Sequence, residues 1–149
     1  MADEMKECDC KLDGCLFFST AKLARVFGKI ADDAFSKTGL SPSHALLLYL
    51  VNQEGGIPQK EIGELLHLMP STITRFVEKL EQKKLVRKRN QGKNVYLCTT
   101  EKGLSMQDEI IKAWNNLNKK YKNILTEAET LQYILLSNKL LSEIENQED

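Results

Sequence analysis

The chain has 149 residues and a formal net charge of zero, with 42% hydrophobic and 28% charged residues. This length suits one domain with an appended helical part, and it is enough to bury a hydrophobic core. No stretch approaches the roughly 18 consecutive apolar residues of a membrane span, and no signal peptide is visible. These features exclude a membrane partner, and we expect a cytoplasmic protein.

The neutral total hides an uneven distribution of charge. Residues 70–102 hold nine Lys or Arg against three Glu, whereas residues 123–149 hold one Lys against six acidic residues. Residues 1–15 add a further net charge of −3. A basic segment within a neutral chain is the electrostatic footprint of a nucleic-acid binder.

The first part of the chain predicts a tail followed by a long helix. Residues 1–14 are polar and acidic without apolar periodicity, so an exposed tail is expected. A helix from about Cys15 to Lys37 follows, and its apolar coverage is broader than a surface helix needs. Gly39 ends this helix as a residue with positive φ would.

A second helix begins at Ser41 and Pro42, which suit the N-cap and the first turn. Its residues from Ala45 to Val51 are apolar nearly all round, so this helix should be buried. Gly55 and Gly56 stop the helix, and Ile57 is a candidate for a short third strand.

Residues 58–80 predict a helix-turn-helix. The first helix spans Pro58–His67, Leu68 and Met69 turn the chain, and the second helix runs from Pro70 to about Leu80. Short hydroxyls and an arginine on the leading turns of the second helix suit a helix that enters the major groove and contacts base edges. A generic pair of antiparallel helices is the alternative, because such patterns have many false positives. The candidate base-reading residues are Ser71, Thr72, Thr74 and Arg75.

The next segment predicts a basic hairpin, or wing. Strands at Leu85–Arg89 and Asn94–Thr99 are joined by Asn90–Lys93, in which Gly92 is available for a positive φ. Cations along the hairpin and the preceding helix are candidates for contacts to phosphates or to the minor groove. These cations are Lys79, Lys83, Lys84, Arg87, Lys88, Arg89 and Lys93.

Two further helices complete the chain. Thr100 caps a long helix that continues to about Leu125, and Thr126 with Glu129 forms a capping box for the last helix. Three long apolar helices are more than a compact basic module requires, so we expect the first and last helices to bury against a second copy. An intrachain helical bundle without a dimer is the alternative. A two-fold dimer would place paired recognition helices about 34 Å apart on a pseudo-palindromic DNA site.

The fold class is therefore predicted as mainly α with a small β-hairpin wing. Residues 41–103 form the winged helix-turn-helix, and residues 15–40 and 104–149 form a helical dimerisation region.

The run from Glu64 to Val86 resembles the core of the MarR family (multiple-antibiotic-resistance regulators), and Leu97–Gly103 resembles that family's exit from the wing. Family members often carry an acidic residue where this chain has Met69, and an aspartate and arginine in the wing where it has Asn90–Lys93. The resemblance implies a dimeric winged-helix regulator of transcription. It also implies a cavity for a small aromatic ligand, near Phe17, Ala21, His44 and Leu48.

Three of the four cysteines cluster before or at the start of the first helix: Cys8, Cys10 and Cys15. A thiolate at a helix N-terminus is reactive, and thiolates bind soft metals, so redox or metal sensing is one hypothesis. Reduced cysteines in a mobile tail are the other. Cys98 is expected in the core of the wing.

Enzymatic patterns are missing. The two histidines, His44 and His67, lie in separate helices without catalytic neighbours, and neither a P-loop nor a Rossmann fingerprint is present. A structural role is favoured for His44. We therefore expect a dimeric, sequence-specific DNA-binding transcription regulator, a repressor, with no cofactor and no enzymatic activity. A winged helix that docks proteins rather than DNA is the alternative.

Overall fold

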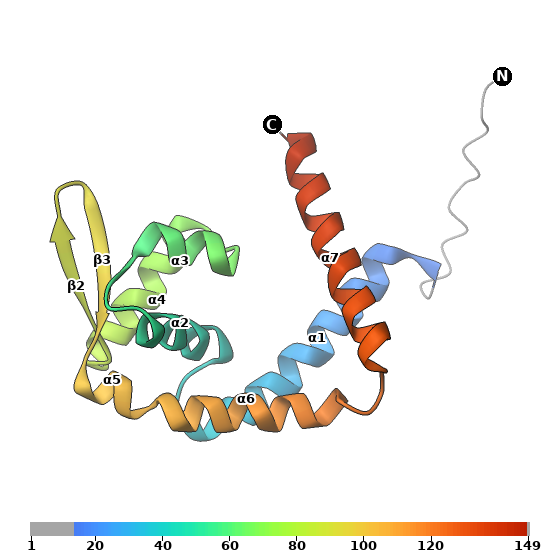
Figure 1. Ribbon diagram of the computed structural model, residues 1–149, viewed down its shortest axis with the longest axis horizontal. Coiled ribbons are helices and arrows are strands. Elements are labelled where there is room, and N and C mark those ends of the chain that lie inside the picture. The colour runs from blue at the N-terminus through green and yellow to red at the C-terminus, as the bar shows by residue number, and fades with distance from the viewer. Residues whose placement is uncertain (1–13, 149) are drawn as a thin grey trace. The chain divides into compact units, whose positions relative to one another are not determined.

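The computed structural model of the protein describes residues 14–148 and is mainly helical with one small sheet (Figure 1). By contacts the chain divides into two units, with the boundary between Trp114 and Asn115. The predicted fold class is confirmed. The elements are α1 (Leu16–Phe35), a 3₁₀ turn (Ser36–Thr38), α2 (Pro42–Gln53), β1 (Ile57–Pro58), α3 (Gln59–Leu66), α4 (Pro70–Gln82), β2 (Val86–Gln91), β3 (Asn94–Thr99), α5 (Glu101–Ser105), α6 (Gln107–Tyr121) and α7 (Glu127–Glu148).

The hydrophobic core lies in the first unit, around α2. Ala45, Leu47, Leu48 and Val51 expose no surface, as expected for a helix that is apolar nearly all round. The apolar faces of α3 and α4 and the inner face of the sheet close over this helix. Their buried side chains are Ile62, Ile73, Val77, Leu80, Val86 and Leu97, and Leu85 of the turn before β2 is buried with them.

The sheet is antiparallel with the order β1-β3-β2. The predicted third strand is confirmed, because Ile57 and Pro58 pair with Leu97 and Tyr96 of β3. The wing differs from the prediction in its turn. β2 extends to Gln91, which pairs with Asn94, so only Gly92 and Lys93 connect the strands. Gly92 has the predicted positive φ, with a value of 62°. A glycine at the first position of a two-residue turn suits a type II′ hairpin.

Helix ends follow the predicted capping residues. The Ser41 hydroxyl accepts a hydrogen bond from the His44 amide at the start of α2, over 3.3 Å. Gly39, with a φ of 71°, ends the 3₁₀ turn that follows α1. At the start of α7, the Thr126 amide donates to Glu129 Oε2 (2.8 Å) and the Glu129 amide donates to Thr126 Oγ1 (3.2 Å), so the predicted capping box is confirmed.

The predicted long helix from Thr100 to about Leu125 is wrong. Thr100 does cap a helix, since its hydroxyl accepts from the Gly103 amide, but α5 ends at Ser105 and α6 begins at Gln107. The stretch has no proline, so the break has a cause other than the commonest one.

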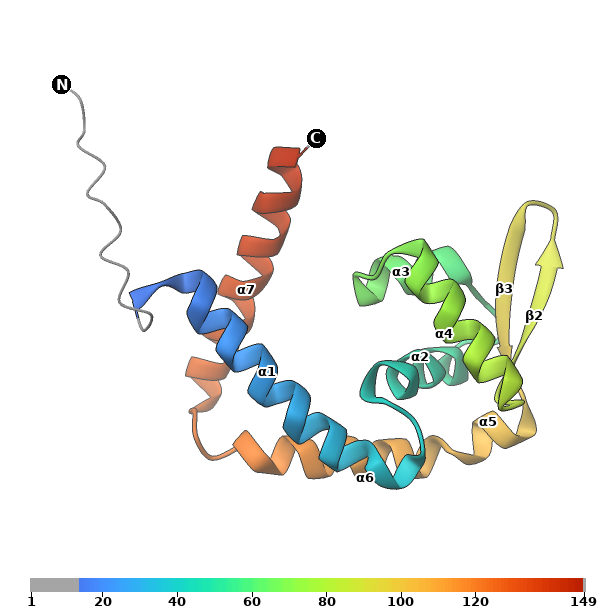
Figure 2. The same ribbon diagram turned by 180° about the vertical axis from the view of Figure 1, so that it is seen from behind.

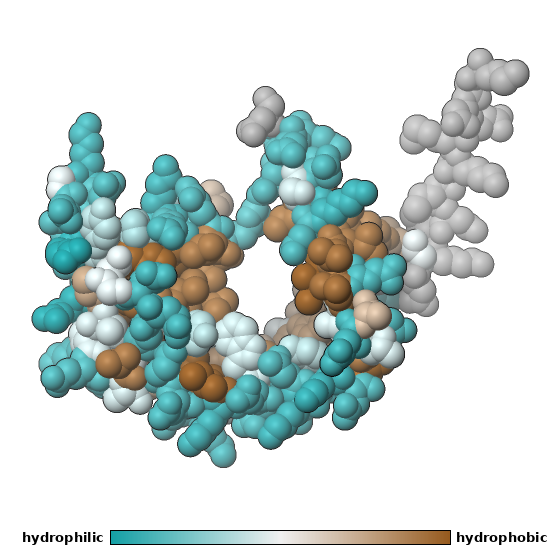
Figure 3. Space-filling view, in the orientation of Figure 1, coloured by the Kyte–Doolittle hydropathy of each residue, from teal (hydrophilic) through white to brown (hydrophobic). Residues whose placement is uncertain are grey.

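The second unit exposes its apolar residues. In the part of the chain that the structure describes, no residue of α7 is buried. Figure 3 shows hydrophobic residues gathered on α7. Its large exposed apolar side chains are Leu131, Tyr133, Ile134, Leu135, Leu136, Leu140, Leu141 and Ile144. Among the described residues 14–148, no helix is long and apolar enough to pass through a bilayer.

Candidate nucleic-acid interface

Helix α4 presents one polar and one buried face, as its sequence predicts. Ile73, Val77 and Leu80 are buried at helical spacing, which leaves Ser71 and Arg75 exposed and Thr72 half-buried on the leading turns. Lys79 is exposed one turn further along the helix. Pro70 occupies the first turn, and the N-cap residue Met69 makes no side-chain capping bond.

Helix α3 supports α4 through a polar contact that the sequence did not reveal. Thr74 Oγ1 donates to the Pro70 carbonyl (2.9 Å) and accepts a hydrogen bond from Gln59 Nε2 (3.4 Å). The donor hydrogen of the Thr74 hydroxyl is therefore used within the protein, which leaves one acceptor lone pair and the methyl group for an outside partner. Gln59 comes from the first turn of α3, 15 positions earlier, so only the fold could bring the two together.

The two faces of the wing carry different cations. Residues opposite one another in an antiparallel pair share a face, so Arg87 and Arg89 lie with Cys98 and Tyr96. The guanidinium of Arg89 lies 5.5 Å from the centre of the Tyr96 ring, within the range of a cation–π contact. Lys88 lies on the other face, where its Nζ is 3.2 Å from Glu81 Oε1 of α4.

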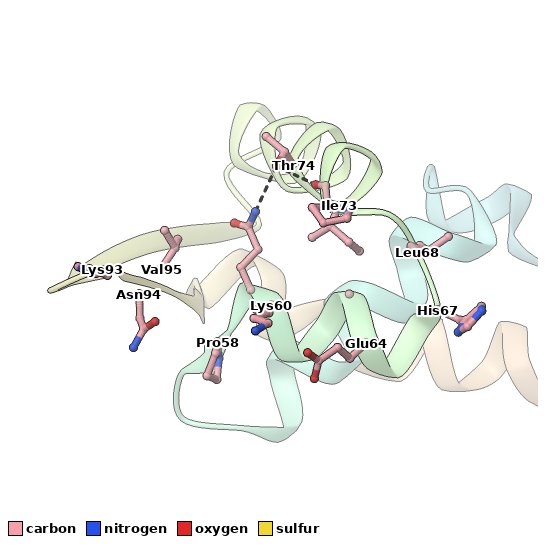
Figure 4. A pocket seen from close by; sticks show the side chains of 13 residues that line it. Pro58, Lys60, Glu64, His67, Leu68, Ile73, Thr74, Lys93, Asn94 and Val95 are labelled. Atoms are coloured by element: carbon pink, nitrogen blue, oxygen red, sulfur yellow. Dashed lines mark hydrogen bonds between the residues drawn. The ribbon is translucent and has the colours of Figure 1, made fainter. Parts of the chain in front are cut away.

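A groove of about 560 Å³ lies between α3, α4 and the wing. Figure 4 shows Thr74 of α4 on one side of this groove, Pro58 and Glu64 on another, and Lys93 at the hairpin. Lys60, in the first turn of α3, also lines it, and the sequence analysis did not select this residue. The signal was available, since helix N-termini attract phosphates and a lysine in the first turn adds charge there.

The turn after α4 is tied to the start of α5. Lys84 adopts a left-handed conformation with a φ of 59°. Its carbonyl accepts from Thr100 Oγ1 (2.7 Å), and the carbonyl of Lys83 accepts from Lys102 Nζ (3.1 Å). Gly103 packs against the same turn so closely that a Cβ there would lie 2.1 Å from the Leu85 carbonyl oxygen. The trailing end of α4 is therefore held against the base of the wing, an arrangement visible from behind in Figure 2.

His44 is a core residue of the winged module. The ring is stacked on Phe76 of α4, with centroids 4.2 Å apart, and its Nδ1 shares a hydrogen bond with the Ser41 hydroxyl. Burial, and then the positive charges of Lys79 and Lys83, hold the pKa of His44 below its usual value near 6.5. His67 ends α3 in a left-handed conformation and is exposed.

The four residues of the expected effector cavity lie in different environments. Phe17 on α1 is 71% exposed, whereas Leu48 on α2 exposes no surface. Ala21 is half-buried, and His44 faces Phe76. A ligand that touches Leu48 therefore requires α2 and its neighbours to move apart.

The cysteine cluster is only partly visible. Cys8 and Cys10 lie outside the described residues, and Cys15 is a half-buried free thiol at the N-cap of α1. Cys98 is half-buried in β3. Within residues 14–148 no group of three His, Cys, Asp or Glu side chains is arranged to hold a metal ion.

Comparison with known proteins identifies this architecture. Residues 40–94, which span the helix-turn-helix and most of the wing, match the model of the MarR family. The chain is 27% identical over 132 residues to the HTH-type transcriptional repressor MdtR of Bacillus subtilis, covering 85% of each protein.

The winged helix-turn-helix of this chain matches the MarR family.

Solved MarR-family structures share its fold. One is the regulator PcaV from Streptomyces coelicolor in complex with its natural ligand, with a TM-score of 0.81 and 21% identity over 91% of this chain and 98% of that one. Another is a MarR-family regulator from Listeria monocytogenes complexed with a 26mer DNA, with a TM-score of 0.76 and 24% identity over 89% and 91%. At these identities the likeness establishes the fold.

Proposed function

We propose that this protein is a dimeric, sequence-specific DNA-binding transcription regulator that acts as a repressor. The observation that carries the proposal is the exposed polar face of α4, flanked by a hairpin with exposed Arg87, Arg89 and Lys93. Support comes from two relatives: one is named a transcriptional repressor, and one was crystallised with DNA.

In this proposal α4 enters the major groove. Arg75 donates to base edges, with guanine as the preferred partner of a bidentate arginine. Ser71 and Thr72 contact bases or phosphates beside it. Because the Thr74 hydroxyl is bonded to Pro70 and Gln59, we assign Thr74 an apolar contact through its methyl group, such as to a thymine methyl.

The wing and the ends of α3 and α4 would contact the DNA backbone. Arg89, held over Tyr96, and Lys93, at the hairpin turn, are assigned to phosphates or the minor groove. Arg87 shares the face of Arg89, and Lys79 follows Arg75 by one turn. Lys60 joins this set because it lines the same groove as Lys93. Lys88 is less suited, because Glu81 partly neutralises its charge.

The exposed apolar residues of α1 and α7 support a homodimer. Large exposed apolar patches mark protein interfaces, and Phe17 and Val26 of α1 are exposed by 71% and 59%. We assign residues 41–103 to DNA binding, and residues 15–40 and 104–149 to dimerisation. A two-fold dimer places two α4 helices on successive major grooves of a pseudo-palindromic operator.

DNA selection tests the proposal against a protein-docking winged helix. The full chain is incubated with a random duplex pool, and bound DNA is sequenced over several rounds. We expect enrichment of a pseudo-palindrome with half-sites about 10 base pairs apart, and affinity that falls steeply with salt. A pool that shows no enrichment, together with no salt-dependent shift, would refute DNA binding.

Regulation is proposed to come from an effector near α1 and α2 or from the N-terminal thiols. A ligand that prefers one spacing of the recognition helices would shift the population of that spacing, and a coupling of ~1–3 kcal/mol suffices for a switch. Phe17, Ala21, His44 and Leu48 are the candidate residues for a small aromatic ligand. Cys8, Cys10 and Cys15 are the candidates for oxidant or metal.

The two kinds of regulation separate in one experiment. Operator affinity is measured for the wild type and for a Cys8/Cys10/Cys15→Ser variant, each with salicylate, hydrogen peroxide and Zn(II). A variant with the full peroxide and zinc response would end the thiol hypothesis. A wild type that is indifferent to salicylate but released by oxidant would end the cavity hypothesis.

A further inference from the structure

The break between α5 and α6 occurs without a proline in the local sequence. Gly103 and Ser105 stand just before the break, but the apolar spacing from Leu104 onward favours one continuous helix. The structure nevertheless ends α5 at Ser105 and begins α6 at Gln107. Sharp breaks without proline commonly arise where a side chain inserts into the helical hydrogen-bond ladder.

The side chain of Asn52, in the last turn of α2, bonds to the backbone of α5 at this break. Its Nδ2 donates to the Gly103 carbonyl (3.1 Å) and to Gln107 Oε1 (2.8 Å). In a continuous helix the Gly103 carbonyl would accept from the Gln107 amide. Here that carbonyl accepts from the Met106 amide (3.2 Å) and from Asn52. We call the contacts of Asn52 with Gly103 and Gln107 the Asn52 clamp.

The orientation of the Asn52 amide follows from its partners. The Gly103 carbonyl can only accept, so the atom that faces it must be the amide nitrogen, and the facing atom of Gln107 must then be its oxygen. Asn52 Oδ1 is buried without a hydrogen-bond partner among the described residues. A buried acceptor without a partner destabilises the folded protein, so the unpaired Oδ1 offsets part of the stability that the two donated bonds contribute.

Both sides of the Asn52 clamp are anchored in the winged module. Asn52 follows Val51, which exposes no surface, on the helix whose first turn packs His44 against Phe76 of α4. On the other side, Gly103 lies against the Leu85 carbonyl at the end of the turn that follows α4. The clamp therefore links the packing around the recognition helix to the residue at which α6 begins.

A local contact offers a competing cause for the break. Ser105 Oγ donates to the Lys102 carbonyl over 2.6 Å, and such back-bonding bends helices. This contact lies in the last turn of α5 and does not involve α2. The two causes differ in their prediction for variants of Asn52.

We propose that Asn52 is a positioning residue: the Asn52 clamp holds the α5–α6 break and so fixes the direction of α6 relative to α4. Through α6 this direction sets the spacing of the two recognition helices in the dimer, and thereby operator affinity, without contact between Asn52 and DNA. The effect on affinity rests on the DNA-binding function proposed above, whereas the effect on the break does not.

The break is tested by a distance within one chain. Spin labels are placed at Gln82→Cys on α4 and Lys112→Cys on α6, both exposed positions, in a full chain whose four natural cysteines are serine. Labelled protein is mixed with excess unlabelled protein, and the distance is measured by pulsed electron paramagnetic resonance. The test variant is Asn52→Leu, of similar size but without a donor, and Gln53→Leu on the exposed neighbouring position is the control.

We expect Asn52→Leu to shift or broaden the distance distribution and Gln53→Leu to leave it unchanged. Asn52→Asp and Gln107→Met repeat the test with smaller changes to packing, in case Asn52→Leu folds poorly by thermal unfolding. An unchanged distance in the folded Asn52 variants would overturn the proposal. A shift of equal size in Ser105→Ala would also overturn it, because the break would then be local.

Operator affinity and its salt dependence give the functional test. Loss of the Asn52 clamp should weaken operator binding by about 2- to 12-fold. This range is the net free-energy contribution of one hydrogen bond expressed as a change in affinity. The slope of log affinity against log salt should stay unchanged, because no phosphate contact is lost. Asn52→Leu and Gln107→Met should be non-additive in a double-mutant cycle. Wild-type affinity in a variant whose distance has shifted would refute the positioning role, whereas a wild type that binds no selected DNA would refute the proposed function instead.

Discussion

Among single residues, Arg75 is the one whose substitution should change sequence discrimination most. It is exposed on the leading half of α4, beside hydroxyls that the structure half-buries. A bidentate arginine–base contact provides ~1–3 kcal/mol of discrimination. Arg75→Ala should therefore bind operator variants with nearly equal affinity while keeping weak, salt-dependent binding. Arg75→Lys is the matched variant, since it keeps the charge and loses the planar fork. Competition binding with operator variants measures sequence discrimination in both proteins. Wild-type discrimination in Arg75→Ala would show that Arg75 does not contact bases.

Two lysines of the wing form a natural comparison. Lys93 lies at the hairpin turn, whereas Lys88 lies on the inner face in an ion pair with Glu81. If Lys93 contacts a phosphate, Lys93→Ala should reduce the slope of log affinity against log salt by ~0.9. Lys88→Ala should change this slope less, because its charge is already partly compensated. Titrations at several salt concentrations measure the slopes, and equal effects of the two substitutions would contradict the assignment.

His44 should make stability depend on pH. Its pKa is lowered in the folded state by burial and by Lys79 and Lys83, so the unfolded chain binds this proton more readily. The free energy of unfolding should therefore be highest above the unfolded pKa near 6.5 and decrease as the pH falls below it. His44→Gln should flatten this decrease, whereas His67→Gln should retain it. Urea unfolding from pH 8 to pH 5 measures the effect, and a wild type whose pH dependence survives in His44→Gln would contradict it.

Gly103 is decisive at the scale of elements, because it allows α5 to lie on the turn after α4. A Cβ at this position would lie 2.1 Å from the Leu85 carbonyl oxygen and 2.7 Å from Thr99 Oγ1. Gly103→Ala should therefore destabilise the protein by about 1–3 kcal/mol or more, as overpacking does. Gly55→Ala is the control, since Gly55 lies between α2 and β1 with nothing within 4 Å of its Cβ position, and it should stabilise by ~0.4–1 kcal/mol. Denaturant unfolding compares the two, and similar values would show that α5 can shift at little cost.

Elements whose signals are local were predictable from the sequence. The caps at Ser41 and Thr126, the positive φ at Gly39 and Gly92, and the short strand at Ile57 all follow from neighbouring residues. The α5–α6 break was missed, and Asn52, whose side chain bonds to residues on both sides of it, lies about 50 positions away. The same holds within the candidate site. Exposure of Arg75 follows from helical periodicity, whereas the engagement of Thr74 by Gln59 and of Lys88 by Glu81 depends on how the elements pack.

At the scale of the whole molecule, the two units bury their side chains very differently. The first unit contains the core around α2, with Leu47, Leu48 and Ile62 fully buried. Helix α7 contains no buried residue although it is rich in leucine and isoleucine. A helix cannot gain stability from an apolar face that stays in water, since most helical stability comes from packing. The exposed face of α7 is therefore the strongest physical argument for a second copy.

Leu135 tests this argument, because it is 59% exposed and central in α7. Burying a leucine contributes about 1.5–3 kcal/mol, and a two-fold interface would count it twice. Leu135→Glu should therefore raise the dissociation constant of the dimer at least about a hundredfold and reduce operator affinity with it. Gln132→Glu is the matched control, since it adds the same charge to the same helix at an exposed polar position. Sedimentation velocity measures the oligomeric state, and circular dichroism checks that the winged module stays folded. A Leu135→Glu protein that remains a dimer with wild-type operator affinity would exclude this face of α7 from the interface.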